Sequence, residues 1–228
     1  MREGYDASPL NPVPGVVWLI LLPIVAMEIV VSAGMLGLAG GAGGIGWRQE
    51  ALQRFALAPQ MLGEMRENGQ WSADYLMRFV SYAFVHGSFM QALLASVFIL
   101  AMGKFVGEVF RPLGVLAVFL AAVIAGGVAY SLMPGTKFAL FSAFSGAYGL
   151  IGAFTFIIWA RLGAENANRA RAFTLIGFLL GAQLLFGVLF GGTADWVADL
   201  AGFGAGFGLS FVVGPGGPSH ILKRIRQR

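Results

Sequence analysis

Residues 194–208 read Ala-Asp-Trp-Val-Ala-Asp-Leu-Ala-Gly-Phe-Gly-Ala-Gly-Phe-Gly, and this stretch decides how the rest of the chain is interpreted. It opens the last long apolar run and carries an ionisable residue, Asp199, inside that run. Gly202 and Gly206 follow at the four-residue spacing that lets two membrane helices approach each other closely. A carboxyl group beside such a packing face, within the membrane, predicts a functional site. The alternative is that Asp199 lies at the membrane surface and only caps its helix.

The composition of the chain is that of an integral membrane protein. Of its 228 residues, 57% are hydrophobic and 11% are charged, and the mean hydropathy is +0.77. A soluble domain carries about 25% charged residues. The polar start of the chain and the apolar run that follows it do not have the form of a cleavable signal peptide. We therefore expect the first apolar run to remain in the protein as a membrane span.

Six apolar runs are long enough to cross a bilayer, which takes about 20 helical residues. They are residues 14–35, 79–102, 113–133, 141–160, 172–190 and 196–213. Between the first two lies a long loop, residues 36–78, which begins Gly-rich and then places Leu52, Phe55 and Leu57 among charged residues at helix-like spacing. This pattern predicts one or two amphipathic helices at the membrane surface. The expected fold is an all-α bundle of six transmembrane helices.

The basic residues predict the orientation of the bundle. Ten of the fifteen Lys and Arg residues fall in segments that share a side with the N-terminus. By the positive-inside rule, the N-terminal segment 1–13 and the basic tail 214–228 are both cytoplasmic. The tail is then explained by anionic lipid headgroups in the bilayer and not by nucleic acid. We expect one membrane domain over residues 1–228, and the absence of cysteine together with an Arg-dominated basic set is typical of a bacterial inner membrane protein.

No cofactor or metal site is expected. The chain has no cysteine and only two histidines, His86 and His220. These numbers exclude Cys-ligated metals and argue against a multi-histidine centre. The Gly-rich segment 37–46 is not followed by a Lys-Ser or Lys-Thr step, so it does not have the form of a phosphate-binding loop.

Polar residues on three of the predicted helices form a candidate site. The second span carries His86 and Gln91, with Ala95 four residues beyond Gln91 on the same helix face. The fourth span opens with Ser145-Gly146, and the sixth carries Asp199. A serine, a carboxyl and an amide on three helices are a plausible convergent site.

These residues also carry a resemblance to the rhomboid family of intramembrane serine proteases, and the resemblance extends from the long first loop to the sixth span. The segment from Ala198 to Gly206 is similar to the family's Ala-His-x-x-Gly-x-x-x-Gly, with Asp199 where the catalytic histidine belongs. The second span resembles a pattern of His, a second His five residues on and Asn four further. Here those positions are His86, Gln91 and Ala95. The resemblance implies a six-helix fold with a lateral gate that admits a substrate helix.

The family's nucleophilic serine can be aligned with this chain in two ways. Ala143-Phe144-Ser145-Gly146 resembles the family's Gly-x-Ser-Gly, with alanine in place of the first glycine. Counting forward from the Ser-Gly step gives Ser145, which we prefer because it preserves that dipeptide. Counting back from the helix body at residues 148–152 gives Phe144 instead.

The resemblance implies a degenerate catalytic apparatus. A serine hydroxyl needs a general base, and an aspartate, with a reference pKa of about 3.9 against about 6.5 for histidine, is the weaker base. Of the oxyanion donors that the resemblance implies on the second helix, Gln91 retains an amide, but Ala95 has no donor, and losing one such donor typically lowers turnover by about 10²–10³. His86 is interpreted as a structural residue that bonds loop backbone.

The sequence therefore predicts a protein that binds the transmembrane segments of client proteins without cleaving them. Two alternatives remain open: an active intramembrane protease that uses Ser145 with Asp199, and a six-helix transporter. The sequence does not specify the client or the oligomeric state.

Overall fold

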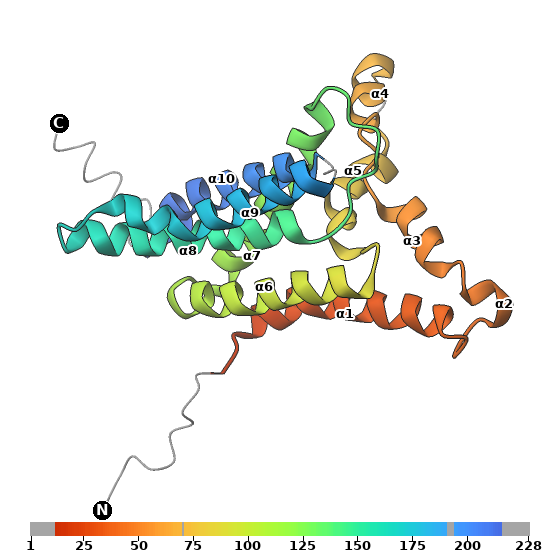
Figure 1. Cartoon of the computed structure of the whole chain (residues 1–228), viewed down its shortest axis with the longest axis horizontal. Helices are drawn as coiled ribbons and strands as arrows, with labels where there is room; N and C mark the ends of the chain where they lie inside the picture. The colour runs from red at the N-terminus through yellow and green to blue at the C-terminus, as the bar shows by residue number, and fades with distance from the viewer. Residues whose placement is uncertain (1–11, 70, 191–193, 216–228) are drawn as a thin grey trace, which may run out of the picture.

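The computed structural model describes residues 12–69, 71–190 and 194–215, which fold into helices joined by short loops (Figure 1). Five of the described helices are long and apolar enough to cross a membrane: α1 (Gly15–Met35), α6 (Phe89–Val109), α7 (Pro112–Leu132), α8 (Phe144–Ala164) and α10 (Asp195–Val213). A further apolar helix, α9 (Thr174–Phe190), has 17 residues and follows the short 3₁₀ helix η2 (Arg169–Phe173). The expectations for residues 1–11, His220 and most of the tail 214–228 lie outside the described residues.

The long loop after α1 contains more helices than the sequence predicts. Instead of one or two, it holds four short helices: α2 (Gly41–Gly44), α3 (Trp47–Phe55), α4 (Met61–Asn68) and α5 (Ala73–Ser81). The predicted number of helices in this loop is wrong for a local reason. Gly40 and Gly69 adopt positive φ angles of 74° and 63°, and these angles interrupt the helical pattern. Arg78 ties two of these helices together by donating to the carbonyl oxygens of Gln53 at 2.9 Å and Ala56 at 3.3 Å.

The predicted second span, residues 79–102, is displaced by about two to three helical turns from the observed one. After α5 the chain forms the 3₁₀ helix η1 (Tyr82–Phe84) and then becomes extended at Val85, before α6 begins at Phe89. Ser88 caps α6 by accepting a hydrogen bond from the backbone N–H of Gln91, while the Gln91 side chain accepts from the backbone N–H of Gly87. This reciprocal arrangement is close to a capping box and fixes the start of the helix. Hydropathy alone does not detect it.

Among the long helices, α6 lies between α1 and α8 and packs against both (Figure 1). Helices α1 and α6 lie side by side, and α8 and α10 form a second pair with α7 packed against both. The α8–α10 crossing depends on glycine: a side chain at Gly202 would collide with the backbone carbonyl of Ser145, and one at Gly206 with that of Gly149. The close approach of the two backbones explains why only glycine fits there.

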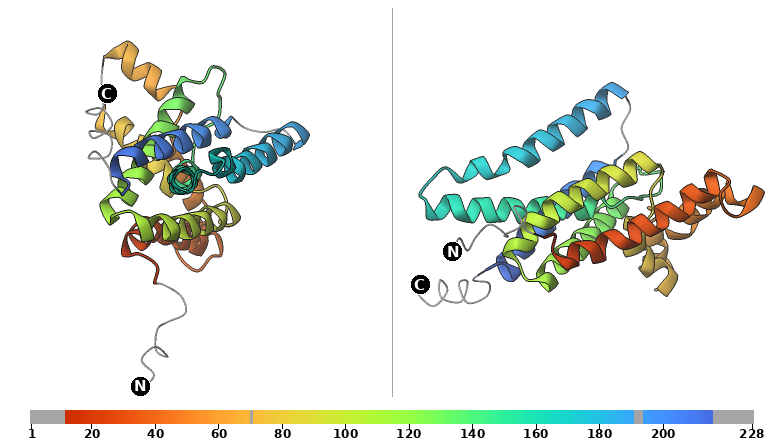
Figure 2. Two further views of the ribbon diagram at one scale, coloured as in Figure 1. Left: turned by 90° about the vertical axis from the view of Figure 1, so that its left-hand side faces the viewer. Right: turned by 90° about the horizontal axis from the view of Figure 1, so that it is seen from below.

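Helix α9 is the outlier of the bundle. Figure 2 shows it diverging from α8 along its length, starting from the turn that joins the two helices. Near that turn Ile176 is buried against Tyr148, Ile151 and Phe203. Farther along, Leu185 and Leu189 are exposed. Only the first part of α9 is therefore embedded in the described core.

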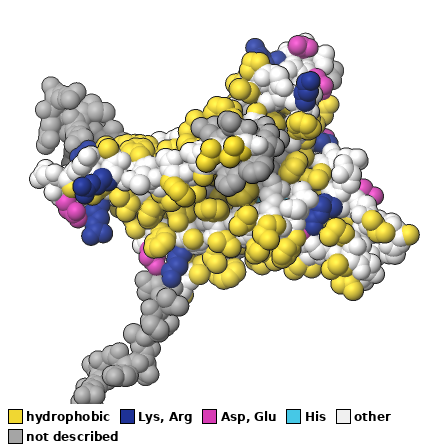
Figure 3. Space-filling view, in the orientation of Figure 1, with side chains coloured by type: hydrophobic (Ala, Val, Ile, Leu, Met, Phe, Trp, Pro, Cys, Tyr) yellow, Lys and Arg dark blue, Asp and Glu magenta, His cyan; other side chains and the backbone are white. Residues whose placement is uncertain are grey.

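The surface of the long helices is apolar. On α1, Leu19, Leu22 and Ile29 are each about 60% exposed. Figure 3 shows hydrophobic side chains covering α1 and α6, with Lys and Arg side chains gathered toward the ends of the long helices and on α4. Helices that are apolar on the core face and the outer face alike are suited to lipid. The described part of the chain is thus an integral, multi-pass membrane protein.

Candidate functional site

The segment that leads into α8 is held in place by three backbone anchors. Leu140 exchanges two hydrogen bonds with Leu57 of the first loop, at 2.8 and 2.9 Å. The backbone N–H of Ser142 donates to the carbonyl of Tyr82 at 2.9 Å, and that of Ala143 donates to Nε2 of His86 at 3.3 Å. The first turn of α8, which carries Ser145, is therefore positioned by the first loop and by residues 82–86.

Ser145 is buried, and its hydroxyl is bound to a tyrosine. The Ser145 hydroxyl lies 2.7 Å from the hydroxyl of Tyr82, which in turn donates to the backbone carbonyl of Val123 at 2.7 Å. A phenol has one proton. Because that proton goes to Val123, the hydrogen bond between the two hydroxyls is donated by Ser145. The proton that a protease would transfer to its base is thus directed toward a phenol oxygen.

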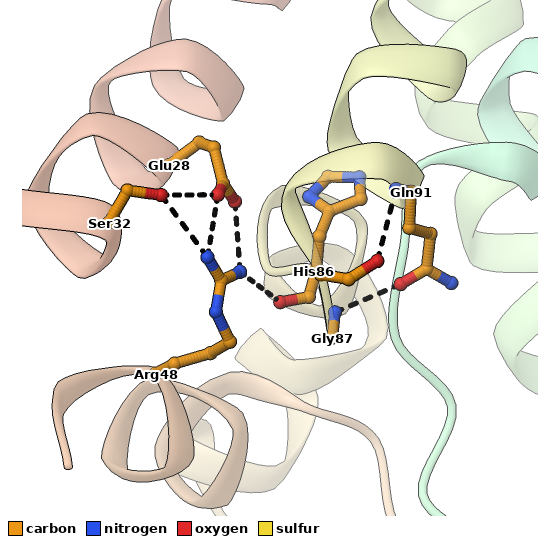
Figure 4. A network of polar contacts seen from close by, with 7 residues as sticks. Glu28, Ser32, Arg48, His86, Gly87 and Gln91 are labelled. Atoms are coloured by element: carbon orange, nitrogen blue, oxygen red, sulfur yellow. Dashed lines mark hydrogen bonds and ion pairs between the residues drawn. The ribbon is translucent and has the colours of Figure 1, made fainter. Parts of the chain in front are cut away.

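His86 belongs to a polar network that joins α1, α3 and the loop before α6 (Figure 4). Arg48 binds Glu28 through both terminal nitrogens, at 3.0 and 2.6 Å, and donates to the backbone carbonyl of His86 at 2.9 Å. Ser32 adds a third donor to the same carboxylate, at 2.7 Å. Together with the bond from Ala143 to the His86 ring, these contacts connect α1 to the start of α8. His86 bonds loop backbone, as the structural interpretation of this residue expects.

Burial keeps His86 in its neutral form. Desolvation is the largest cause that lowers the pKa of His86, to about 4, with Glu28 raising it and Arg48 lowering it further. A neutral ring is also what the geometry requires, because Nε2 accepts the hydrogen bond from Ala143. The side chain is 4% exposed and serves as an acceptor for the chain entering α8.

The two other second-helix positions are Gln91 and Ala95, and among the described residues neither side chain donates a hydrogen bond. The side-chain oxygen of Gln91 accepts from Gly87 at 2.9 Å, which assigns this residue to the start of α6. Ala95 is fully buried in the apolar core. On α8, a side chain at Gly146 would overlap the ring of Phe119, so this glycine permits the packing of α7 against α8.

Asp199 is bound by an amide on α9. The side-chain N–H of Gln183 donates to Oδ2 of Asp199 at 2.8 Å, and the Gln183 oxygen accepts from the hydroxyl of Tyr148 at 3.2 Å. Asp199 is 5% exposed and lies one turn inside α10, which begins at Asp195 with Ala194 as its N-cap residue. Asp199 therefore does not cap its helix. Three helices, α8, α9 and α10, meet at this chain of polar groups.

The structure brings Ser145 and Asp199 onto the same pair of crossing helices but gives them different partners: Tyr82 for the serine and Gln183 for the aspartate. Sequence reasoning missed Tyr82, Gln183 and Arg48. Gln183 carried a detectable signal, because a carboxamide within an apolar run is expected to seek a polar partner inside a membrane. Tyr82 and Arg48 carried none, since their partners come from distant parts of the chain.

Phe144, the alternative nucleophile position, faces a different neighbour from Ser145. Its ring lies 6.3 Å from that of Phe98 on α6, in an edge-on arrangement. Tyr148 lies one helical turn beyond Phe144 and thus on the same face of α8. The face shared by Phe144 and Tyr148 points toward α6 and toward the Gln183–Asp199 pair, whereas Ser145 points toward Tyr82 and α7.

Comparison with known proteins agrees with this architecture. The family model described as Rhomboid domain matches residues 73–216, from the start of α5 to just beyond the end of α10. A search of curated proteins found no match. The matched region makes up more than half of the chain and includes the α8–α10 crossing, Ser145 and Asp199. The chain belongs to the rhomboid family.

Proposed function

We propose that this chain is a six-span rhomboid-fold protein that binds the transmembrane helices of client proteins and does not cleave them. The observation that carries the proposal is that the two would-be catalytic groups have different hydrogen-bond partners. The Ser145 proton is donated to Tyr82, and the Asp199 carboxyl accepts from Gln183. A serine without a base is a poor nucleophile, whereas accommodating a helix between membrane spans requires neither group to be ionised or reactive.

The backbone before α8 supports a nucleophile column at Phe144, the register that we did not prefer from the sequence. Ser142 adopts a φ angle of 98°, which is a conformation that favours glycine. In the family's Gly-x-Ser-Gly pattern the first glycine stands two residues before the serine. If Ser142 stands where the family has its first glycine, Phe144 stands where the family has its serine. Ser145 then stands where the family has its second glycine. In this register the chain lacks the nucleophile as well as the base.

The proposed topology has six spans, with α9 as the fifth. Helix α9, with 17 residues, is only slightly shorter than the five helices that are long enough to cross a membrane. It lies between α8 and α10 in the chain. Six spans agree with α1 beginning and α10 ending at the same end of the bundle (Figure 1). The excess of basic residues at that end supports a cytoplasmic location of both termini and a single domain over residues 1–228. The short helices of the first loop are then proposed to lie near the opposite membrane surface, and the host membrane to be a bacterial inner membrane.

The proposal is tested by reconstituting the protein in liposomes with a tagged transmembrane helix that rhomboid proteases cleave. We expect the helix to co-purify intact with wild type and with Ser145→Ala. Cleavage by wild type that is lost in Ser145→Ala would support the protease alternative and overturn the proposal. The double substitution Phe144→Ser with Asp199→His serves as the matched gain-of-function variant, because it supplies a nucleophile and a base in the proposed register.

A further inference from the structure

The carboxamide of Gln183 fills a site with two complementary walls. One wall is the Asp199 carboxyl, which accepts from the Gln183 N–H at 2.8 Å. The other is the Tyr148 hydroxyl, which donates to the Gln183 oxygen at 3.2 Å. The two walls belong to α8 and α10, whose backbones are fixed against each other by Gly202 and Gly206. The site itself is therefore rigid, while its occupant comes from a third helix.

The helix that supplies the occupant is less firmly held than the walls. Helix α9 diverges from α8 after the turn that joins them (Figure 2). Its described apolar packing involves Ile176, which is buried, and Leu175, Leu179 and Leu180, which are partly buried, all of them before Gln183 in the chain. Phe178 on its outer side is 72% exposed. Among the described side chains, both hydrogen bonds between α9 and the walls are made by Gln183. A competing carboxamide can thus take the place of Gln183 by making the same two hydrogen bonds.

We infer that the clients of this protein are transmembrane helices that carry an asparagine or glutamine at membrane depth, and that this side chain takes the place of Gln183 between Tyr148 and Asp199. The inference rests on the proposed helix-binding function and specifies its substrate class. An apolar client helix offers the site nothing, and its binding leaves the Gln183 bonds unchanged. A client carboxamide is itself costly to leave in lipid without a partner, and between Tyr148 and Asp199 it finds both the donor and the acceptor that it needs.

The chemistry of the two walls selects the carboxamide among polar side chains. A carboxamide carries a donor and an acceptor on separate atoms, as Gln183 uses them. A lysine ammonium satisfies the carboxyl but offers no acceptor to the Tyr148 hydroxyl. A client carboxylate would face Asp199 with a like charge or with a shared proton.

The experiment measures the affinity of the full-length protein, in nanodiscs, for model helices that differ at one central position, Gln or Leu. Interhelical hydrogen bonds in membranes predict up to about three- to tenfold tighter binding of the Gln helix, and in wild type the preference lies at the low end of this range because Gln183 competes for the same partners. In Gln183→Leu the internal competitor is removed, so the preference for the Gln helix is expected to increase further. In Asp199→Leu the preference is expected to disappear, and in Tyr148→Phe to decrease. Phe178→Leu, on the outer side of α9, is the matched control and is expected to retain the wild-type ratio.

The outcomes separate this inference from the function on which it rests. Equal affinities for the Gln and Leu helices in wild type would overturn the inference and leave helix binding intact. No binding of either helix would overturn the proposed function. Should Gln183→Leu not fold, because it leaves Asp199 unpaired, the ratio of the two affinities in wild type, compared with that in Asp199→Leu, still decides the question. An unchanged preference in Asp199→Leu would place the recognition elsewhere and refute the assigned site.

Discussion

Among the described residues, the long helices bury two carboxyl groups, and the surroundings of these two groups differ. Glu28 on α1 receives three side-chain donor groups, two of them from the Arg48 guanidinium. Among the side chains that the structure describes, Asp199 on α10 has one hydrogen bond, from the neutral amide of Gln183. The first carboxylate has its charge matched and its acceptor positions filled by the fold itself. Asp199 is held by the one contact with Gln183, which a ligand can replace. Glu28 is therefore a structural acid, whereas Asp199 is available to a ligand.

The location of each acid supports the same distinction. Glu28 and Arg48 connect α1 to the first loop and, through His86, to the start of α8 (Figure 4). Asp199 lies on the rigid α8–α10 pair, facing the helix with the least described packing. Breaking the first group is therefore expected to affect folding, and changing the second to affect binding.

The largest expected effect is from Arg48→Met. This change leaves Glu28 buried without its counter-charge, and breaking one side of a buried ion pair typically costs about 3–5 kcal/mol. Thermal unfolding in detergent is the measurement, and Arg54→Met, an exposed position on the same helix α3, is the control, with an expected change within about 0.5 kcal/mol. The double variant Glu28→Met with Arg48→Met should recover part of the loss. Equal stability of Arg48→Met and Arg54→Met would remove the structural role assigned to Glu28.

The next effect is a pH dependence from His86. Its pKa in the folded protein, about 4, lies below the ordinary value of 6.5, so the unfolded chain binds more protons between these values. Stability is then fully present above about pH 6.5 and is lost as the pH falls toward 4, by about 3 kcal/mol at most. His86→Gln, which retains an acceptor for Ala143 but does not titrate, should flatten this dependence, while His220→Gln should not. The same acid slope in His86→Gln and in wild type would assign it to other groups.

A smaller effect is expected at the α8–α10 crossing that holds Asp199 in place. Gly206→Ala forces apart two backbones in contact and should cost about 1–3 kcal/mol. Gly204→Ala is the matched control, because no atom lies within 4 Å of a side chain added there. The control should be neutral or slightly stabilising, since alanine is the better helix former. Equal unfolding temperatures for the two variants would mean that the crossing is not fixed by glycine.

The smallest effect on stability is expected at Asp199 itself. Asp199→Asn replaces one of the two carboxyl oxygens by an NH2 group and leaves the other able to accept from Gln183, so it should change the unfolding free energy by about 1 kcal/mol or less. Thermal unfolding of Asp199→Asn and Arg48→Met in the same detergent compares the two losses of stability directly. A loss as large as that of Arg48→Met would make Asp199 a second structural acid and weaken its assignment to binding.

The sequence was sufficient for much of the fold but for less of the site. Apolar runs and motif order predicted the long helices other than α6 to within a few residues, because lipid-facing helices must be apolar along their length. The start of α6 was mispredicted, since its capping by Ser88 and Gln91 competes with an apolar run that continues through residues 79–87. Asp199 and the α8–α10 glycines stood out from local spacing alone.

The partners of the site residues were not predictable in the same way. Tyr82 and Ser145 are separated by 63 positions, and Arg48 and Glu28 by 20. Such pairings depend on how the first loop folds back onto the bundle, for which no local pattern exists. The backbone angle at Ser142, on which we base the proposed register at Phe144, likewise cannot be predicted from the sequence.

The most direct test of the central claim, that this rhomboid-fold protein does not hydrolyse its clients, is labelling by a fluorophosphonate probe, which reacts with activated serine hydroxyls. The hydrogen bond donated by Ser145 to Tyr82 predicts that the wild-type protein, folded in nanodiscs, is not labelled. Phe144→Ser with Asp199→His is the variant in which labelling is expected. Labelling of wild type that is abolished by Ser145→Ala would show an activated serine and contradict the account.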